Sequence, residues 1–130
     1  AGFWMEFLGK NRFKNELFKK NKKNAKLCQE AGVMIAKLHA YGLVHGDLTT
    51  SNFIVEKNEL VLFDFGLGFF SGKIEDFSTD LLNLKKTFFA THPHRMKEWK
   101  ALLVSYEKNF SQGTAVIKQM AAIEKRARYY

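Results

Sequence analysis

The stretch "VHGDLTTSNFIVEKNELVLFDFGLG", Val44 to Gly68, decides the fold and the function class of this chain. It contains two short apolar runs, Phe53 to Val55 and Leu60 to Phe63, joined by "EKNE". Apolar runs of this length around a polar linker predict a β-hairpin. Two oxygen-bearing side chains, Asn52 and Asp64, stand directly outside these runs, and a third, Asp47, lies five residues before Asn52. The hairpin would therefore bring them toward one another.

These three residue types suit a magnesium site. Mg²⁺ prefers oxygen ligands and usually takes only one or two from the protein, while water and phosphate groups supply the others. Phosphoryl transfer needs alignment and charge neutralisation more than covalent help from the protein. The pattern therefore favours an aspartate that meets a substrate hydroxyl, Asp47, beside two magnesium ligands, Asn52 and Asp64.

Helical periodicity dominates the rest of the chain, and the predicted class is α+β. Apolar residues recur at helical spacing from Ala25 to Tyr41, where Gly42 would end the helix. Three more helices are expected at about Thr79–Ala90, capped by Ser78, at Arg95–Phe110 and at Gly113–Ala127. Leu43 and Val44 form a further short apolar run, and residues 69–78 are expected to be a loop.

Composition indicates one globular domain. The chain has 130 residues, 46% of them hydrophobic, and no run approaches the roughly 20 apolar residues of a membrane helix. The first residues lack the pattern of a secretory leader, so a cytoplasmic location without membrane contact is expected. Cys28 is the single cysteine, which excludes an internal disulfide and a cysteine-based zinc site; we expect it to be buried.

Charge is unevenly distributed, with a net value of +8. Seven acidic residues and two lysines lie between Leu43 and Asp80, whereas the flanking segments are rich in lysine and arginine. An acidic centre suits a divalent cation, and basic flanks suit a polyanion such as RNA. A solvated lysine-rich surface explains the flanks equally simply.

The segments "HGDLTTSN" and "LFDFGLG" resemble the catalytic loop and the D-F-G metal loop of protein kinases. Together with "LHAYGLVHGDLTTSNFIV", "IEDFSTDLLNLKKTFFATHP" and "EKRARYY", they resemble the small atypical RIO-like kinases of the KEOPS complex, from about Phe3 to Tyr130. The resemblance implies a kinase-like C-terminal lobe that uses ATP and Mg²⁺. It also implies a serine/threonine kinase or ATPase that works beside a transferase subunit to make threonylcarbamoyladenosine on transfer RNA.

The resemblance also assigns roles to individual residues. Asp47 would be the catalytic base, and Asn52 and Asp64 would hold magnesium. His45 would be structural, and Asp80 would support the catalytic loop through its backbone amides. Glu6 and Phe7 would be the hinge contact to ATP, and Ile54 and Phe63 would form the floor under the adenine. Arg126 and Arg128 would belong to a basic tail linked to the active site and transfer RNA.

The chain also departs from ordinary kinases. Gly46 stands where many of them carry arginine, no A-P-E motif follows Asp64, and Ala127 stands where the family usually has glycine. Switching by loop phosphorylation and broad peptide phosphorylation are therefore not expected, and the tail departs from the family pattern at Ala127. His92 and His94 flank Pro93 without a third ligand nearby, which favours a structural role over a metal site.

No glycine-rich loop or strand lysine precedes the expected hinge at residues 3–9. Residues 1–130 are therefore expected to form the C-terminal lobe alone, with catalytic and metal loops at 43–68 and helices within 79–127. Such a lobe is expected to bind ATP weakly. The sequence leaves open whether an N-terminal lobe is encoded upstream or supplied by another chain. Two alternative functions also stay open, a non-catalytic lobe that docks the transferase and RNA, and a fragment of an aminoglycoside- or choline-type phosphotransferase.

Overall fold

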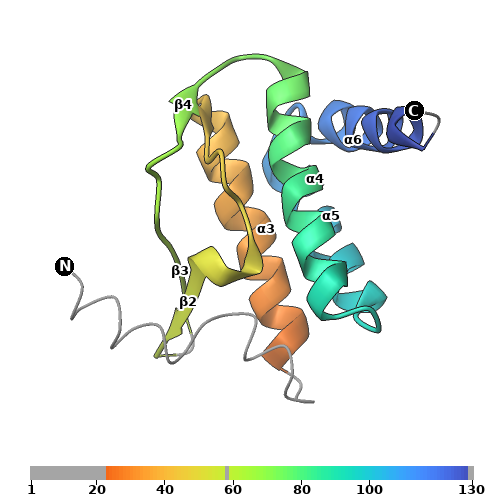
Figure 1. Cartoon of the computed structure of the whole chain (residues 1–130). Helices are drawn as coiled ribbons and strands as arrows, with labels where there is room; N and C mark the ends of the chain where they lie inside the picture. The colour runs from red at the N-terminus through yellow and green to blue at the C-terminus, as the bar shows by residue number, and fades with distance from the viewer. Residues whose placement is uncertain (1–22, 58, 129–130) are drawn as a thin grey trace.

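The computed structural model describes residues 23–57 and 59–128, and within them it shows a group of helices with two small sheets along one side (Figure 1). The predicted hinge residues Glu6 and Phe7 lie outside the described residues. The elements are helices α3 (Lys23–Ala40), α4 (Ile74–Thr91), α5 (Met96–Asn109) and α6 (Gly113–Ala127), a 3-10 turn η1 (Thr50–Asn52), and strands β1 (Leu43–Val44), β2 (Phe53–Glu56), β3 (Glu59–Leu62) and β4 (Phe69–Phe70). The predicted α+β class is confirmed.

The predicted hairpin is present as strands β2 and β3. They pair antiparallel from Phe53 opposite Leu62 to Glu56 opposite Glu59. This register leaves a two-residue loop, in which Lys57 takes a positive φ of 51°. Positive φ is typical of the tight turns that match the twist of a hairpin.

The prediction of a loop at residues 69–78 holds only for residues 71–73 and is wrong on either side of them. Phe69 and Phe70 form β4, which pairs antiparallel with Val44 and Leu43 of β1. The second half already belongs to α4, which begins at Ile74 rather than at about Thr79. Local sequence gave no sign of the strand because its partner lies some 26 residues earlier in the chain.

Ser78 does not cap α4 but lies inside it. Its hydroxyl donates to the Ile74 carbonyl at 2.7 Å and to the Val116 carbonyl of α6 at 3.0 Å. The start of α4 is instead held by Ser71, whose Oγ accepts from the Lys73 N–H and donates to Asp76. An acidic residue in the first turn also suits the positive end of the helix dipole.

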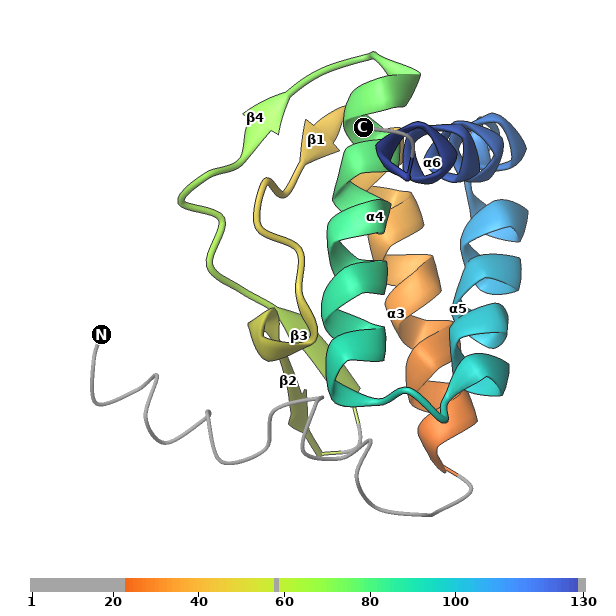
Figure 2. The ribbon, with the colours of Figure 1, turned by 45° about the vertical axis from the view of Figure 1, so that its right-hand side comes forward.

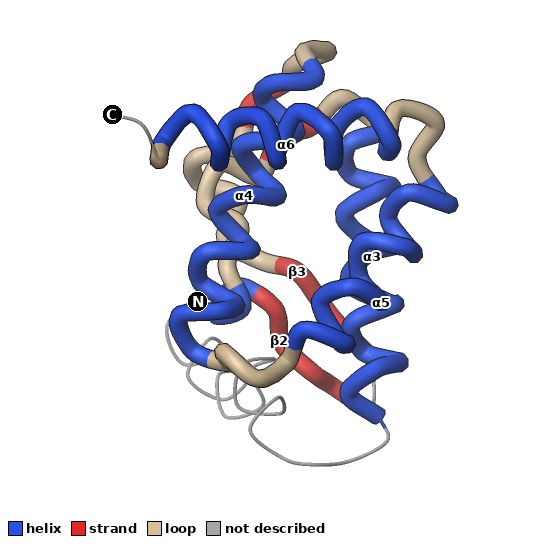
Figure 3. The backbone as a smooth tube through the Cα atoms, turned by 90° about the vertical axis from the view of Figure 1, so that its right-hand side faces the viewer, coloured by secondary structure: helices blue, strands red, loops and turns tan. Residues whose placement is uncertain are grey.

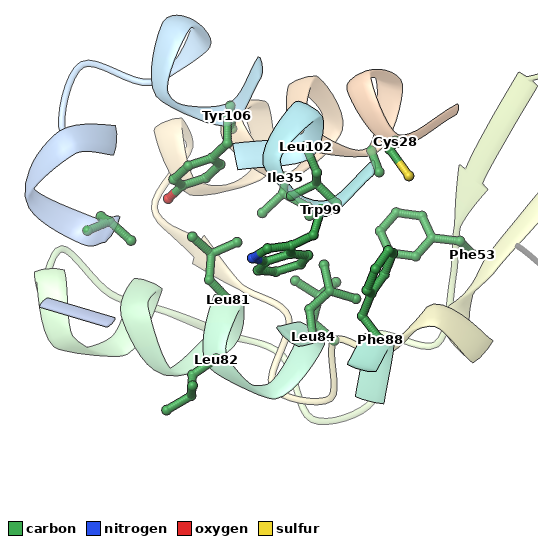
Figure 4. Packing of buried hydrophobic residues seen from close by; sticks show 14 of the residues in the cluster. Cys28, Ile35, Phe53, Leu81, Leu82, Leu84, Phe88, Trp99, Leu102 and Tyr106 are labelled. Carbon is green, nitrogen blue, oxygen red and sulfur yellow. The ribbon is translucent and has the colours of Figure 1, made fainter. Parts of the chain in front are cut away.

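One hydrophobic core lies between α3, α4 and α5 (Figures 2 and 4). It contains the predicted buried cysteine, Cys28, together with aliphatic and aromatic side chains from all three helices and from β2. The labelled residues of Figure 4 are Cys28, Ile35, Phe53, Leu81, Leu82, Leu84, Phe88, Trp99, Leu102 and Tyr106. Helix α6 crosses one end of this group and packs on α4.

The ends of α5 differ slightly from the sequence expectation. Helical spacing places Met96 on the same face as Trp99, Leu102, Leu103 and Tyr106, but Met96 is 49% exposed. It is the first residue of the helix and projects beyond the core, whereas Trp99, Leu102 and Tyr106 are buried. No helix among residues 23–57 and 59–128 is long and apolar enough to cross a membrane.

Candidate active site

The hairpin holds Asp47, Asn52 and Asp64 in one region through two hydrogen bonds. The buried Asn52 donates from Nδ2 to the Asp47 carbonyl at 2.6 Å. Its own carbonyl accepts from the N–H of Phe63 at 3.0 Å, and Asp64 is the next residue. With Nδ2 engaged by Asp47, the Oδ1 atom of Asn52 is left as an oxygen ligand. The predicted catalytic and metal loops are thus tied together at one end of the hairpin.

Asp64 has an unusual backbone. Its φ is +66°, in the left-handed region that disfavours most side chains and that aspartate tolerates better than most. The following residues turn sharply, with the Gly68 N–H donating to the Phe65 carbonyl at 2.9 Å. The Asp64 side chain is exposed. A strained turn that presents a carboxylate to solvent is a common feature of functional sites.

His45 connects the two loops. The buried ring accepts the Asp47 N–H at Nδ1, 3.1 Å away, so its proton sits on Nε2, which donates to the Phe63 carbonyl at 3.0 Å. The ring also lies 4.8 Å from that of Phe65. Because both ring nitrogens form hydrogen bonds, His45 holds the backbones of Asp47 and Phe63 in place and is not available as a ligand or a base.

Asp80 supports the catalytic loop from α4. Its fully buried carboxylate accepts the His45 N–H at 2.9 Å and the Gly46 N–H at 3.1 Å. It also accepts from Nε2 of His39, on α3, at 2.9 Å. This geometry matches the supporting role that the sequence resemblance implies for Asp80.

The network extends further than sequence reasoning found. The Nδ1 atom of His39 lies 2.6 Å from the Tyr106 hydroxyl on α5. Burial raises the pKa of this hydroxyl, and the charge of Asp80 raises it further, so Tyr106 stays protonated and can donate. His39 follows Ile35 by four residues, so a polar side chain on the apolar face of that helix was the available signal.

Gly46 is required by the close approach of the two loops. Its φ is +89°, and a Cβ atom here would lie 2.3 Å from the Leu67 carbonyl oxygen. An arginine in this position, as in many kinases, does not fit this backbone.

The other predicted residues lie in two places, Ile54 and Phe63 in or next to the hairpin and Arg126 in α6. Ile54 is buried but stays outside the main core that Phe53 and Val55 join, because successive side chains of a strand point to opposite faces. Phe63 is half-buried. Arg126 forms an exposed ion pair with Glu75 in the first turn of α4.

Arg128 is exposed just after the end of α6. His92, predicted to be structural, is buried and ends α4, with its N–H donating to the Phe88 carbonyl. This position at the C-terminal end of α4 favours a structural role for His92 over metal binding.

The donor set fits magnesium bound together with a nucleotide. Within the described part of the chain no group of three or more histidine, cysteine, aspartate or glutamate side chains could hold a metal ion. The residues that would hold the ion are Asp64, through its exposed carboxylate, and Asn52, through its amide oxygen, which is the number of protein ligands that Mg²⁺ takes when phosphates complete its shell.

Comparison with known proteins agrees with this geometry. The RIO domain family matches residues 3–101. The EKC/KEOPS complex subunit bud32 of Dictyostelium discoideum is 33% identical over 96% of this chain and 53% of its own length. The mouse EKC/KEOPS complex subunit Tp53rkb is 39% identical over 78% of this chain and 43% of its own.

Archaeal proteins also match. A probable bifunctional tRNA threonylcarbamoyladenosine biosynthesis protein of Methanococcus maripaludis is 42% identical over 82% of this chain. That match covers 19% of the archaeal protein. The chain therefore spans about half, or much less, of the length of these relatives.

Proposed function

Since the chain belongs to the RIO domain family, whose fold is kinase-like, we propose that residues 43–68 form one wall of a magnesium–ATP site. The observation that carries this proposal is the pair of hydrogen bonds through Asn52, from its Nδ2 to the Asp47 carbonyl and from the Phe63 N–H to its own carbonyl. They hold a base candidate and two ligand candidates on adjoining loops. Phosphoryl transfer depends on such positioning.

Each residue has a distinct role in the proposal. Asp64 and Asn52 hold the magnesium ion, which neutralises charge on the phosphates when it is bound. Asp47 orients the attacking hydroxyl or water and accepts its proton; its backbone is fixed on both sides by His45 and Asn52. Ile54 and Phe63 form the floor under the adenine, and Glu6 and Phe7 contact its edge.

We further propose that the reaction serves threonylcarbamoyladenosine formation on transfer RNA, as serine/threonine phosphorylation or ATP hydrolysis beside a transferase subunit. The archaeal relative is named for tRNA threonylcarbamoyladenosine biosynthesis, and the Dictyostelium and mouse relatives are named as KEOPS complex subunits, which supports this proposal. Arg126 and Arg128 are the proposed contacts of the C-terminal tail, and the proposed setting is the cytoplasm.

Calorimetric titration of the full chain with ATP tests the site. We expect ATP to bind more tightly with Mg²⁺ than with EDTA, and we expect Asp64→Ala to abolish this difference because a magnesium ligand is lost. Glu107→Gln, an exposed acid on α5, is the matched control and should keep the difference. Unchanged magnesium dependence in Asp64→Ala would refute the assignment.

A docking lobe without catalysis is the second candidate, and exposed apolar side chains favour it. Tyr41, Leu67 and Phe70 are exposed around the β1–β4 pair, and large exposed apolar groups often mark protein interfaces. Binding of the transferase subunit that is lost in Phe70→Ser but kept in Asp64→Ala would support docking by this surface. It would not by itself exclude catalysis.

A further inference from the structure

A groove of about 990 Å³ runs between α3 and α5, and the proposed ATP site does not use it. Its α3 wall extends from Lys26 to Lys37 and its α5 wall from Lys97 to Lys108. Figures 2 and 3 show the two helices side by side. Each wall spans twelve residues, and the eleven rises of 1.5 Å between its ends make the groove about 16 Å long.

The groove is preformed. The two helices touch at Gly32, where an added Cβ would lie 2.3 Å from the Leu102 carbonyl oxygen. Ser105 also donates from Oγ to the Gln29 carbonyl at 2.8 Å. Such a contact leaves no room for the helices to slide together, so the groove does not close in the absence of a ligand.

Its rim carries unneutralised positive charge. Five lysines line the groove, against two glutamates, Glu30 and Glu59. All five are exposed, and none forms an ion pair with another residue of the described chain. The lysines are Lys26, Lys37, Lys97, Lys100 and Lys108. A groove of this kind attracts an anionic ligand.

The floor of the groove is apolar, which favours an anionic ligand that also has an apolar face. Val33, Met34, Leu60, Ala101 and Val104 contribute to the lining, and Val104 is 53% exposed. Among the described lining residues there is no arginine and no aromatic ring. RNA recognition relies on base stacking and on arginine, whereas an amphipathic helix needs an apolar floor.

We propose that this groove binds an acidic amphipathic helix of a partner protein. The apolar face of that helix, about three turns long, lies on the floor around Met34 and Val104, and its flanking carboxylates meet the two lysine rows. The proposal is independent of ATP chemistry and of Asp47, Asn52 and Asp64.

Fluorescence anisotropy with a labelled synthetic peptide tests it on the full chain. The probe is an 18-residue helix-forming peptide with leucines on one face and glutamates flanking them; a scrambled peptide of the same composition is the control. We expect the scrambled peptide to bind at least about tenfold more weakly, because both peptides carry the same charge but only one has an apolar face.

Protein variants separate the floor from the rim. Val104→Glu and the double change Lys97→Glu, Lys100→Glu should each weaken binding about tenfold or more. The control changes are Lys86→Glu and Lys118→Glu, exposed lysines outside the groove, and they should alter the affinity less than about twofold. Circular dichroism checks that every variant is folded.

Equal affinity for the scrambled peptide, or no effect of Val104→Glu, would overturn the proposal. So would a labelled single-stranded RNA that binds with the same dependence on Lys97 and Lys100 but no dependence on Val104. If the chain self-associates and Val104→Glu makes it monomeric, a second copy occupies the groove and the proposal is also wrong.

Discussion

The buried carboxylate of Asp80 offers the most stringent test of the site architecture. It receives three donors: Oδ2 accepts from the His45 N–H and from His39 Nε2, both at 2.9 Å, and Oδ1 accepts from the Gly46 N–H at 3.1 Å. Asp80→Asn keeps the volume of the side chain but replaces one oxygen by an NH₂ group, which cannot accept. At least one buried donor is then left without a partner in either orientation of the amide.

The expected loss of stability follows from this count. An unsatisfied buried donor costs about 1–3 kcal/mol, and replacing a charged acceptor weakens the bonds that remain. We therefore expect Asp80→Asn to lower the free energy of unfolding by about 2–4 kcal/mol. Asp80→Ala, which removes the acceptor for all three donors, should cost more, about 3–5 kcal/mol, because each unsatisfied buried donor costs about 1–3 kcal/mol.

Urea unfolding followed by circular dichroism measures this loss. Asp76→Asn is the matched control, since Asp76 is a half-buried acid in the same helix that accepts a hydrogen bond from the Ser71 hydroxyl. Amide hydrogen exchange at His45 and Gly46 should become faster in Asp80→Asn, because these N–H groups lose the charge-assisted acceptor that protects them.

The reasoning would be refuted if Asp80→Asn were no less stable than Asp76→Asn, to within about 0.5 kcal/mol, a typical effect of surface substitutions. Unchanged exchange at both amides would show that Asp80 does not hold the loop. Tyr106→Phe adds a finer comparison, because it removes only the hydroxyl that reaches His39. It should cost about 1–2 kcal/mol and leave exchange at Gly46 less affected than Asp80→Asn does.

Three further predictions concern single positions. Gly46→Ala should lower the free energy of unfolding in urea by about 2–3 kcal/mol, because of the positive φ and the clash with the Leu67 carbonyl. Gly72 has open space around it, so the control Gly72→Ala should change stability by less than about 0.5 kcal/mol. Equal effects of the two changes would contradict the packing of the loops at Gly46. Burial raises the pKa of Cys28 to about 12, so the thiol should resist a disulfide reagent at pH 8 until the chain unfolds, and fast labelling of folded protein would contradict its burial. Arg126→Ala should change stability by less than about 0.5 kcal/mol, since its ion pair is exposed, and a larger loss would show a structural role for this pair.

The pH dependence of Cys28 has a definite sign. Its pKa in the folded chain lies above the ordinary value of 9.0, so the unfolded chain loses the thiol proton first as pH rises. The stabilising contribution of the neutral buried thiol is complete below pH 9 and declines from there toward pH 12. Cys28→Ala should remove this part of the alkaline decline in urea unfolding; an identical decline in both proteins would show that other groups cause it.

Sequence patterns predicted the local parts of the molecule well. Helical periodicity located the helices at 25–41, 95–110 and 113–127 to within about two residues. This signal is local, because the apolar residues of one buried helix face recur every three or four positions. The hairpin at residues 53–62 was equally clear. The start of the helix at Ile74 was missed because Ser78 looks like a cap in sequence, whereas its hydroxyl donates to Ile74 and Val116 inside the packed structure.

Sequence by itself therefore predicted the candidate site residues: Asn52 and Asp64 stand at the margins of a hairpin that local pattern reveals, and Asp47 lies five residues before Asn52. Only the tertiary structure decided what holds them. Tyr106 and His39 are 67 residues apart, and His39 and Asp80 are 41 apart, yet they form one buried chain of hydrogen bonds behind the catalytic loop. The pairing of β1 with β4 and the lysine-lined groove between α3 and α5 also depend on contacts between segments that are distant in the sequence. The periodicity of apolar residues shows which face of a helix or strand is buried. Which other segment covers that face is decided only when the segments pack together in the tertiary structure.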